Sequence, residues 1–501
     1  MRLPFFCCIM EEIWYNMREP LWRKPKKFGK KAFNMAFSEF LNSRRSRVKA
    51  LVSILKEQFT YVSVLGVDTK SKSIQVDVNT SNINNGQDTE CGFVVKLNNG
   101  SCFFEYSLDD IGEDVQAAAA QIRESFKISS ILREDCIDGV HPEDAPLVKS
   151  FVRPSDLGSF SDAQLLGFCE KTQKALQAKS ECIRNAFVRL STMEVSKLFI
   201  SENRELDQNY VWVNGMMLLV YQENDKTVQV YDFTDSDHVN DVMEALPGRM
   251  DVLVKKAHFL TLAKPIEPGI YDVITAPSIT GLIAHEAFGH GVEMDQFVKD
   301  RALAKQYVGK YVASPICNMR DGAAATLSVA SYFFDDDGVL AGNTQIIKDG
   351  ILVAGLSDLA SAAQLGTVPT GNGRRESSRR KAYSRMTNTF FEKGTDKLED
   401  MIASIKHGYM LFETDNGMED PKNWAIQCVA QYGIEIVDGK LTDNYVSPVV
   451  MSGYVPDLLK SISMISDDFE ISGAGFCGKG YKEWVRVSDG GPALKARVKL
   501  G

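Results

Sequence analysis

Residues 283–291, with the sequence IAHEAFGHG, place two histidines and a glutamate within one short segment. In a regular α-helix, residues four apart lie about 40° apart around the axis, whereas residues five apart diverge by about 140°. His285 and His290 are five apart, so both can face one ligand only if the helix is locally widened, as in a π-bulge, or bent. Gly289 directly precedes His290, where bending costs least. The spacing predicts a distorted helix.

The residue types in this segment are those of a hydrolytic metal site. Neutral imidazole is a good ligand for a borderline metal such as Zn²⁺. Glu286 follows the first imidazole and can act as general base on a metal-bound water. The alternative is chance adjacency of two structural histidines and a solvated glutamate. Since the chain has only six histidines, we favour metal-assisted hydrolysis.

A catalytic zinc site needs a third protein ligand. Glu293 and Asp295 are candidates because they lie nearby. A better candidate is Cys477, within residues 472–480 (SGAGFCGKG), since glycines let the backbone approach a metal closely and Lys479 would favour the thiolate. The alternative for Cys477 is a structural cysteine in a glycine-rich turn.

Several separated motifs resemble the TldD/PmbA family, specifically its TldD-like metallopeptidase branch, from about residue 49 onward. These motifs are HEAFGH at 285–290, DDG at 336–338, TGNGRR at 370–375, RMTNT at 385–389 and CGK at 477–479. The resemblance implies zinc held by His285, His290 and Cys477, with Glu286 as the base. It also implies the catalytic branch of the family rather than the branch that lacks the histidine motif.

The overall composition restricts the class of protein. Net charge is −9, which gives the chain no electrostatic reason to bind nucleic acid. Its ten cysteines show no disulfide-like spacing and fit a reducing compartment. No run of 18 apolar residues predicts a membrane span. The apolar start ends at Glu11 without a signal cleavage site, and a lipid anchor at Cys7 or Cys8 is the weaker alternative, so we expect a cytoplasmic protein.

The pattern along the chain predicts an α+β fold in three parts. Residues 1–48 form a basic extension, which we interpret as a solvated helix or as sequence upstream of a true start at Met10 or Met17. The alternative is that this basic extension binds nucleic acid or a membrane surface. Residues 49–240 form a helix-flanked, largely antiparallel sheet domain. Residues 241–501 form a β-rich catalytic domain that carries the distorted metal-binding helix.

Local patterns place the individual elements. Residues 61–78 and 91–106 alternate like half-buried strands, and residues 98–100 (NNG) are typical of a hairpin tip. Helical spacing covers residues 108–126, 162–185 and 242–257. Further hairpin tips are expected at 337–338, 348–350 and 437–439.

The glycine-rich, polar segment 370–381 predicts a long surface loop. Because guanidinium groups bind carboxylates bidentately, we expect Arg374, Arg375 and the neighbouring Arg385 to contact carboxylate or carbonyl groups of a peptide.

The resemblance implies a zinc peptidase acting on unfolded or flexible peptides and leader segments, as a homodimer or as a heterodimer with a non-catalytic relative. One alternative is a regulatory or scaffold protein with structural zinc, which would need four closed protein ligands. Another is a zinc amidase acting on small amides.

Overall fold

The computed structural model describes residues 36–501, apart from residues 87, 101–102, 132–144, 224, 474 and 481–482. Most of the predicted extension, with Cys7, Cys8, Met10 and Met17, lies outside the described residues. Within them, no helix is both long and apolar enough to cross a membrane. The domain boundaries predicted at residues 48/49 and 240/241 stay predictions.

The first sheet has eight strands in the order β4-β3-β1-β6-β7-β5, with β2 beside β1 and β8 beside β7. All its pairs are antiparallel except β5 with β7. The strands are β1 Tyr61–Val76, β2 Ser81–Asn85, β3 Glu90–Asn98, β4 Phe103–Leu108, β5 Leu147–Val152, β6 Ile183–Ser201, β7 Arg204–Glu223 and β8 Lys226–Ser236. The expected antiparallel sheet is confirmed, and Gly100 supplies the positive φ at the β3–β4 tip.

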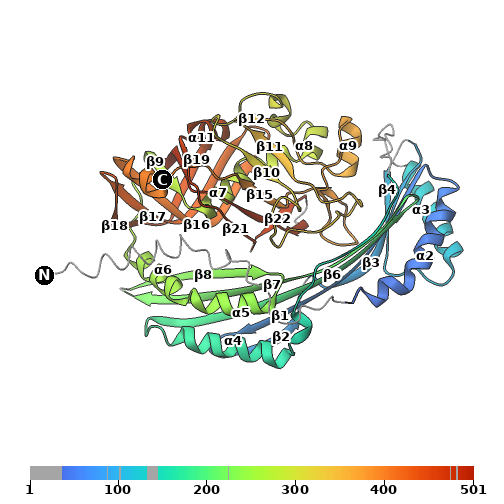
Figure 1. Ribbon diagram of the computed structural model, residues 1–501, viewed down its shortest axis with the longest axis horizontal. Helices are drawn as coiled ribbons and strands as arrows, with labels where there is room; N and C mark the ends of the chain where they lie inside the picture. Colours follow the sequence, from blue (N-terminus) through green and yellow to red (C-terminus); the bar gives the residue numbers. More distant parts are fainter. Residues whose placement is uncertain are drawn as a thin grey trace.

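Five helices cover this sheet, and Figure 1 shows α4 and α5 on its side away from the C-terminal strands. They are α2 Glu39–Lys56, α3 Val115–Ile131, α4 Asp162–Gln177, α5 Val239–Gly248 and α6 Met250–Leu262. One apolar core joins α2 and α3 to one end of the sheet, and another joins α4, α5 and α6 to the other end. The single helix predicted over 242–257 is wrong: it breaks after Pro247, which lies in the last turn of α5 and cannot donate a backbone hydrogen bond.

In the C-terminal part, five strands form a closed ring in the order β16-β9-β25-β19-β17, because β17 also pairs with β16. Strands β18 and β20 extend the ring at β17 and β25. The strands are β9 Gly269–Thr275, β16 His407–Asp420, β17 Ala425–Val437, β18 Lys440–Val446, β19 Val449–Tyr454, β20 Met464–Ile465 and β25 Leu494–Leu500. Closure leaves the ring strands without an open edge along their paired lengths.

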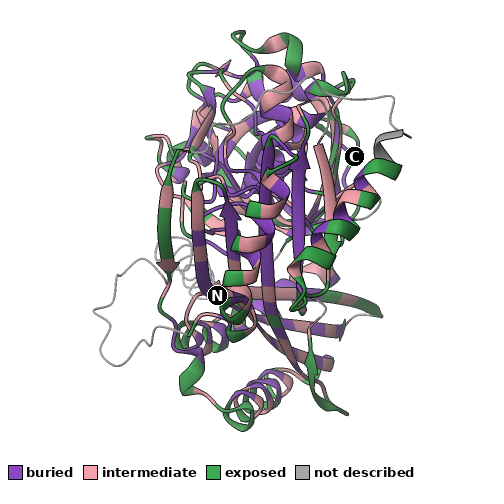
Figure 2. Ribbon diagram, turned by 90° about the vertical axis from the view of Figure 1, so that its right-hand side faces the viewer, coloured by how far each residue is buried: buried purple, intermediate pink, exposed green. Residues whose placement is uncertain are grey.

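A six-stranded sheet and two short hairpins complete this part, giving the β-rich α+β architecture expected. The sheet runs β12 Ile351–Leu352, β11 Thr344–Lys348, β10 Met319–Asp321, β15 Asn388–Phe391, β24 Ser488–Gly491 and β21 Glu470–Ser472. The hairpins are β13 Gly373–Arg374 with β14 Tyr383–Ser384, and β22 Phe476–Lys479 with β23 Glu483–Arg486. The remaining helices are α7 Pro277–Leu282, α8 Met294–Val298, α9 Leu359–Leu365, α10 Leu398–Ala403 and α11 Val455–Ser461. Buried residues run through both layers of strands (Figure 2).

Buried ion pairs join the first sheet to the C-terminal part. Lys96 of β3 pairs with Asp337, and Lys197 of β6 pairs with Asp336. Arg375 pairs with Glu105 of β4 at 3.2 Å and is 8% exposed. The prediction that residues 370–381 form a surface loop is therefore wrong for much of the segment, because residues 371–373, Arg375 and Ser378 are buried.

At Gly338 the backbone of the C-terminal part lies close to the first sheet. Its φ is +75°, and a Cβ added there would overlap the ring of Phe199. Gly366, which ends α9, also has a positive φ but has no atom near an added Cβ.

We expect Gly338→Ala to destabilise the chain more than Gly366→Ala. Both variants should lose about 1 kcal/mol from the left-handed backbone, and Gly338→Ala about 1–3 kcal/mol more from overpacking. Urea unfolding of the two variants measures the difference. Equal losses would show that Phe199 moves aside without cost.

Candidate metal centre

The histidine motif lies on a π-helix. Helix α7 continues directly into a π-helical segment, Ile283–Gly289, and a 3-10 turn, His290–Val292, follows. The backbone N–H of His290 donates to the carbonyl of His285, the i→i+5 bond of a π-helix. The predicted widening of the helix is confirmed.

The role of Gly289 differs from the prediction that the helix bends at this residue. Its φ and ψ are −61° and −47°, which any residue adopts. A Cβ at this position would overlap the sulfur of Met386. The glycine therefore allows close packing of the π-helix against the segment before β15.

The structure brings His285, His290 and Cys477 together, with one ligand atom of each within 4.8 Å of the others. Cys477 enters from hairpin β22–β23, and its Sγ lies 3.5 Å from His290 Nε2. Two ligands of one tetrahedral zinc, at about 2.3 Å for sulfur and 2.0–2.1 Å for nitrogen, would be separated by about 3.5 Å. The buried Nδ1 of His285 has no hydrogen-bond partner among the described residues. The donor types and spacing fit zinc.

The two imidazoles favour the thiolate form of Cys477. Burial by itself would raise the pKa of Cys477, but the imidazoles of His290 and His285 lower it well below 9. The thiolate, which is the form that binds metals, is therefore stabilised. Burial opposes protonation of His290, yet the Cys477 thiolate and Glu293 raise its pKa well above 6.5.

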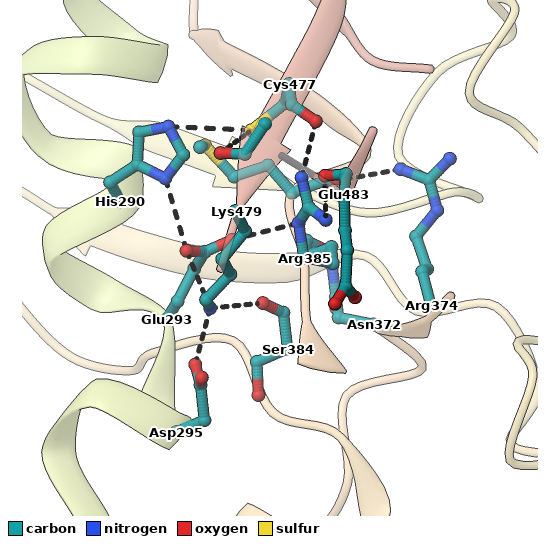
Figure 3. Close-up of polar contacts among 12 residues, drawn as sticks. His290, Glu293, Asp295, Asn372, Arg374, Ser384, Arg385, Cys477, Lys479 and Glu483 are labelled. Atoms are coloured by element: carbon teal, nitrogen blue, oxygen red, sulfur yellow. Dashed lines mark hydrogen bonds and ion pairs between the residues drawn. The ribbon is translucent and has the colours of Figure 1, made fainter. Parts of the chain in front are cut away.

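Glu293 and Asp295, the alternative third ligands, lie one layer outside this group (Figure 3). Glu293 Oε2 lies 3.2 Å from His290 Nδ1 and accepts from Lys479 Nζ at 2.9 Å. Lys479 also donates to Asp295 at 2.6 Å and to the carbonyl of Ser384 at 2.8 Å. Both carboxylates are thus bound to an ammonium group, and Glu293 is placed to orient His290.

Glu286 lies beside the three donors. Its Oε2 is 3.8 Å from His290 Nε2, and its side chain is 21% exposed. Burial raises its pKa, while the neighbouring imidazoles act in the opposite direction. Gly417 of β16 makes room for it, because a Cβ there would lie 2.6 Å from Glu286 Cγ.

The three arginines predicted to bind substrate all make internal contacts. Arg385 is fully buried and donates to the carbonyls of Cys477 at 2.6 Å and Glu483 at 3.2 Å. Arg374 donates to the carbonyls of Met386 and Arg486, each at 2.6 Å, and Arg375 pairs with Glu105. Arg385 thus supports the backbone that carries Cys477, and substrate binding by these arginines stays a prediction.

Two acidic residues near the centre were not predicted from sequence. Glu419 of β16 accepts from the backbone N–H of Gly291 at 3.0 Å, and burial raises its pKa well above 4.5. Asp489 of β24 has a pKa raised to about 6 by burial, against the effect of His285. Neither belongs to a motif with the histidines, so only the fold could reveal them.

We expect Glu293→Gln to weaken zinc binding about 10- to 100-fold, because carboxylates behind a ligand histidine fix its orientation and raise its basicity. Competition with a chelator of known affinity measures the change. The control is Glu435→Gln, which removes the 3.1 Å contact between Glu435 and His407, a pair outside the three-donor group. Equal affinities in both variants would show that Glu293 does not orient His290.

Comparison with known proteins gives the same family as the motifs. A family model described as the PmbA/TldA metallopeptidase C-terminal domain matches residues 268–498. A metalloprotease of Synechocystis sp. is 30% identical over 357 residues, covering 70% of this chain and 76% of that protein. A zinc metalloprotease TldD homolog of Saccharolobus solfataricus is 31% identical over 307 residues, covering 60% of this chain and 68% of that protein.

Among solved structures, TldE from Thermococcus kodakarensis has a TM-score of 0.73 at 17% identity, covering 91% of this chain and 100% of that chain. At this identity the likeness shows the shared fold. The sequence relatives carry the assignment further, since one of them is matched over three quarters of its length. The chain belongs to the TldD/PmbA family of metallopeptidases.

Proposed function

We propose that this chain is a zinc-dependent peptidase in which His285, His290 and Cys477 hold the metal and Glu286 is the general base. The observation that carries the proposal is the meeting of two imidazoles, one thiolate and one partly exposed carboxylate at the end of a π-helix. The zinc metalloprotease relative supports the choice of metal.

Zinc, when bound, lowers the pKa of water towards 7 and polarises the scissile carbonyl. Glu286 accepts a proton from the attacking water and returns it to the leaving amine. Its raised pKa suits both steps, because a carboxyl group whose pKa lies closer to the working pH also protonates the amine more readily. Glu293 keeps His290 in position, and Arg385 fixes the backbone of Cys477.

The number of donors favours catalysis over a structural metal. Structural zinc sites are closed by four protein ligands, whereas catalytic sites keep one position open. Within the described part of the chain, the group has three members, and Glu293 and Asp295 are held by Lys479. The scaffold alternative would require a further ligand.

We expect Glu286→Gln to retain zinc and lose about 10²- to 10⁴-fold in turnover, since a general base contributes about that much. Metal analysis and a peptide-cleavage assay on one preparation test both halves. Near-normal turnover would remove Glu286 as the base. Loss of zinc would instead give it a role in holding the metal.

We expect Cys477→Ser to lose most of its zinc, because a hydroxyl is a much weaker ligand than a thiolate at neutral pH. Cys428→Ser is the control, since that thiol is also buried but lies outside the three-donor group. Undiminished zinc in Cys477→Ser would exclude this cysteine and return attention to Glu293 and Asp295.

We propose that the substrate is an unfolded or flexible peptide or a leader segment. Hairpin β22–β23 is a two-stranded sheet that contains Cys477, so each of its strands has one edge without a paired strand in the described part of the chain. An extended peptide can add backbone hydrogen bonds to such an edge. A compact domain must first unfold locally to do so.

A single substrate in two states tests this. A small domain that folds only with its ligand should be cleaved without the ligand and spared with it. Equal cleavage of both states would indicate an open, general endopeptidase site.

We propose that the active form is a dimer, of two copies or with a non-catalytic family relative. The family resemblance supports this proposal. Light scattering of the chain alone and with such a relative, followed by cleavage assays, distinguishes the two assemblies. A fully active monomer would exclude both.

A further inference from the structure

Three buried hydrogen-bond donors between the first sheet and hairpin β22–β23 have no acceptor among the described residues. They are Arg189 Nε, Asn214 Nδ2 and Arg486 Nε. A buried donor without an acceptor costs about 1–3 kcal/mol, and more when it is charged. Arg375 and Arg385 also have a buried Nε without an acceptor, so the proximity and charge of these three donors, rather than a single unpaired Nε, distinguish this place.

Two of these side chains share one face of the first sheet, and Arg486 lies close enough to act on its charged groups. In the β6–β7 register, Arg189 is opposite Met216 and Ser191 is opposite Asn214, so Arg189 and Asn214 share one face of the sheet. Arg486 lies close enough to Arg189 to lower its pKa, in addition to the effect of burial. Arg486 also acts on Asp235, which is opposite Asn214 in β8.

Positive charge at this place is only partly balanced. Arg189 contacts the sulfur of Met216 at 3.6 Å, and a thioether is a weak acceptor. Arg486 has one acidic partner, Asp88, at 3.3 Å, and its guanidinium lies over the ring of Phe476. Asp235 accepts from the backbone N–H of Gly473 and forms no ion pair within 4.0 Å with either arginine among the described contacts.

These donors lie next to the candidate metal centre. Arg486 is opposite Phe476 in hairpin β22–β23, and Phe476 directly precedes Cys477. Because side chains alternate along a strand, Phe476 and Arg486 share the face opposite to that of Cys477. Trp484, opposite Gly478, lies on this same face, and Phe476 and Trp484 are 37% and 47% exposed. An extended peptide along the hairpin edge would present alternate side chains to the metal and to this face.

We propose that Arg189, Asn214 and Arg486 bind a carboxylate of the peptide substrate, so that this chain prefers peptides with a carboxylate near the bond that is cleaved. The inference rests on the proposed peptidase function and names its substrate class. Guanidinium groups match the planar carboxylate with paired hydrogen bonds, and the Asn214 amide adds a further donor. The carboxylate belongs either to the peptide's C-terminus or to an Asp or Glu side chain.

Peptide binding to the full chain carrying zinc and Glu286→Gln tests this without turnover. Three forms of one flexible peptide are compared: a free C-terminus with an internal Glu, a C-terminal amide, and Glu replaced by Gln. Losing the recognised carboxylate should weaken binding about 10- to 100-fold, as expected for charge-assisted hydrogen bonds. A loss with the amide identifies the terminus, and a loss with Gln identifies the side chain.

Adding Arg189→Gln should abolish this difference between peptides, and Arg189→Lys should restore part of it. The control is Arg184→Gln, which changes an arginine on the same strand that donates to Gln222 and should keep the difference. Arg486→Gln gives a second test from the hairpin side, with thermal unfolding as a check on folding.

Binding that ignores both carboxylates, or an Arg189→Gln variant that keeps the full difference, would overturn this inference while leaving the peptidase proposal intact. Absence of both binding and wild-type cleavage for every peptide would overturn the two together.

Discussion

The hydrogen bond from the backbone N–H of His290 to the carbonyl of His285 is the contact on which the candidate metal centre depends. It widens one helical turn and so lets residues five apart in sequence approach one thiolate. Contacts on either side hold this unusual turn: Met386 packs against Gly289, and Glu419 accepts from Gly291. In a regular helix the two imidazoles would point apart, and Cys477 would meet only one of them.

Local spacing was sufficient to predict this turn, because the constraint lies within six residues. Strand alternation and turn residues likewise predicted the antiparallel sheet and several hairpin tips. The sequence pattern failed for residues 370–381, whose polar composition suggested exposure. Their contacts with Glu105 and Glu90 join residues that are 270 and 288 positions apart in the chain. Polar composition does not reveal such partners. Glu419 and Asp489 escaped prediction for the same reason, since only the fold brings them near the histidines.

The arginines differ in the acceptors that they meet, since Nε lacks an acceptor among the described residues in Arg375, Arg385 and Arg189 alike. Arg385 is fully buried and Arg375 is nearly so. Each donates to acceptors on other segments of the chain. Arg189 has a thioether as its contact and another cation nearby. Position in a sequence motif therefore pointed to arginines that bind backbone carbonyls or carboxylates within the chain, whereas Arg189, on a strand with no motif, contacts a thioether.

The closed ring of strands has a consequence for when the three-donor group can assemble. Strand β25 lies between β9 and β19, and 219 residues separate Thr275 of β9 from Leu494 of β25. During synthesis, the histidines therefore leave the ribosome long before either Cys477 or the strand that closes the ring. A nascent chain presents two imidazoles but no third donor. The three-donor group can therefore be completed only after residue 477 has emerged.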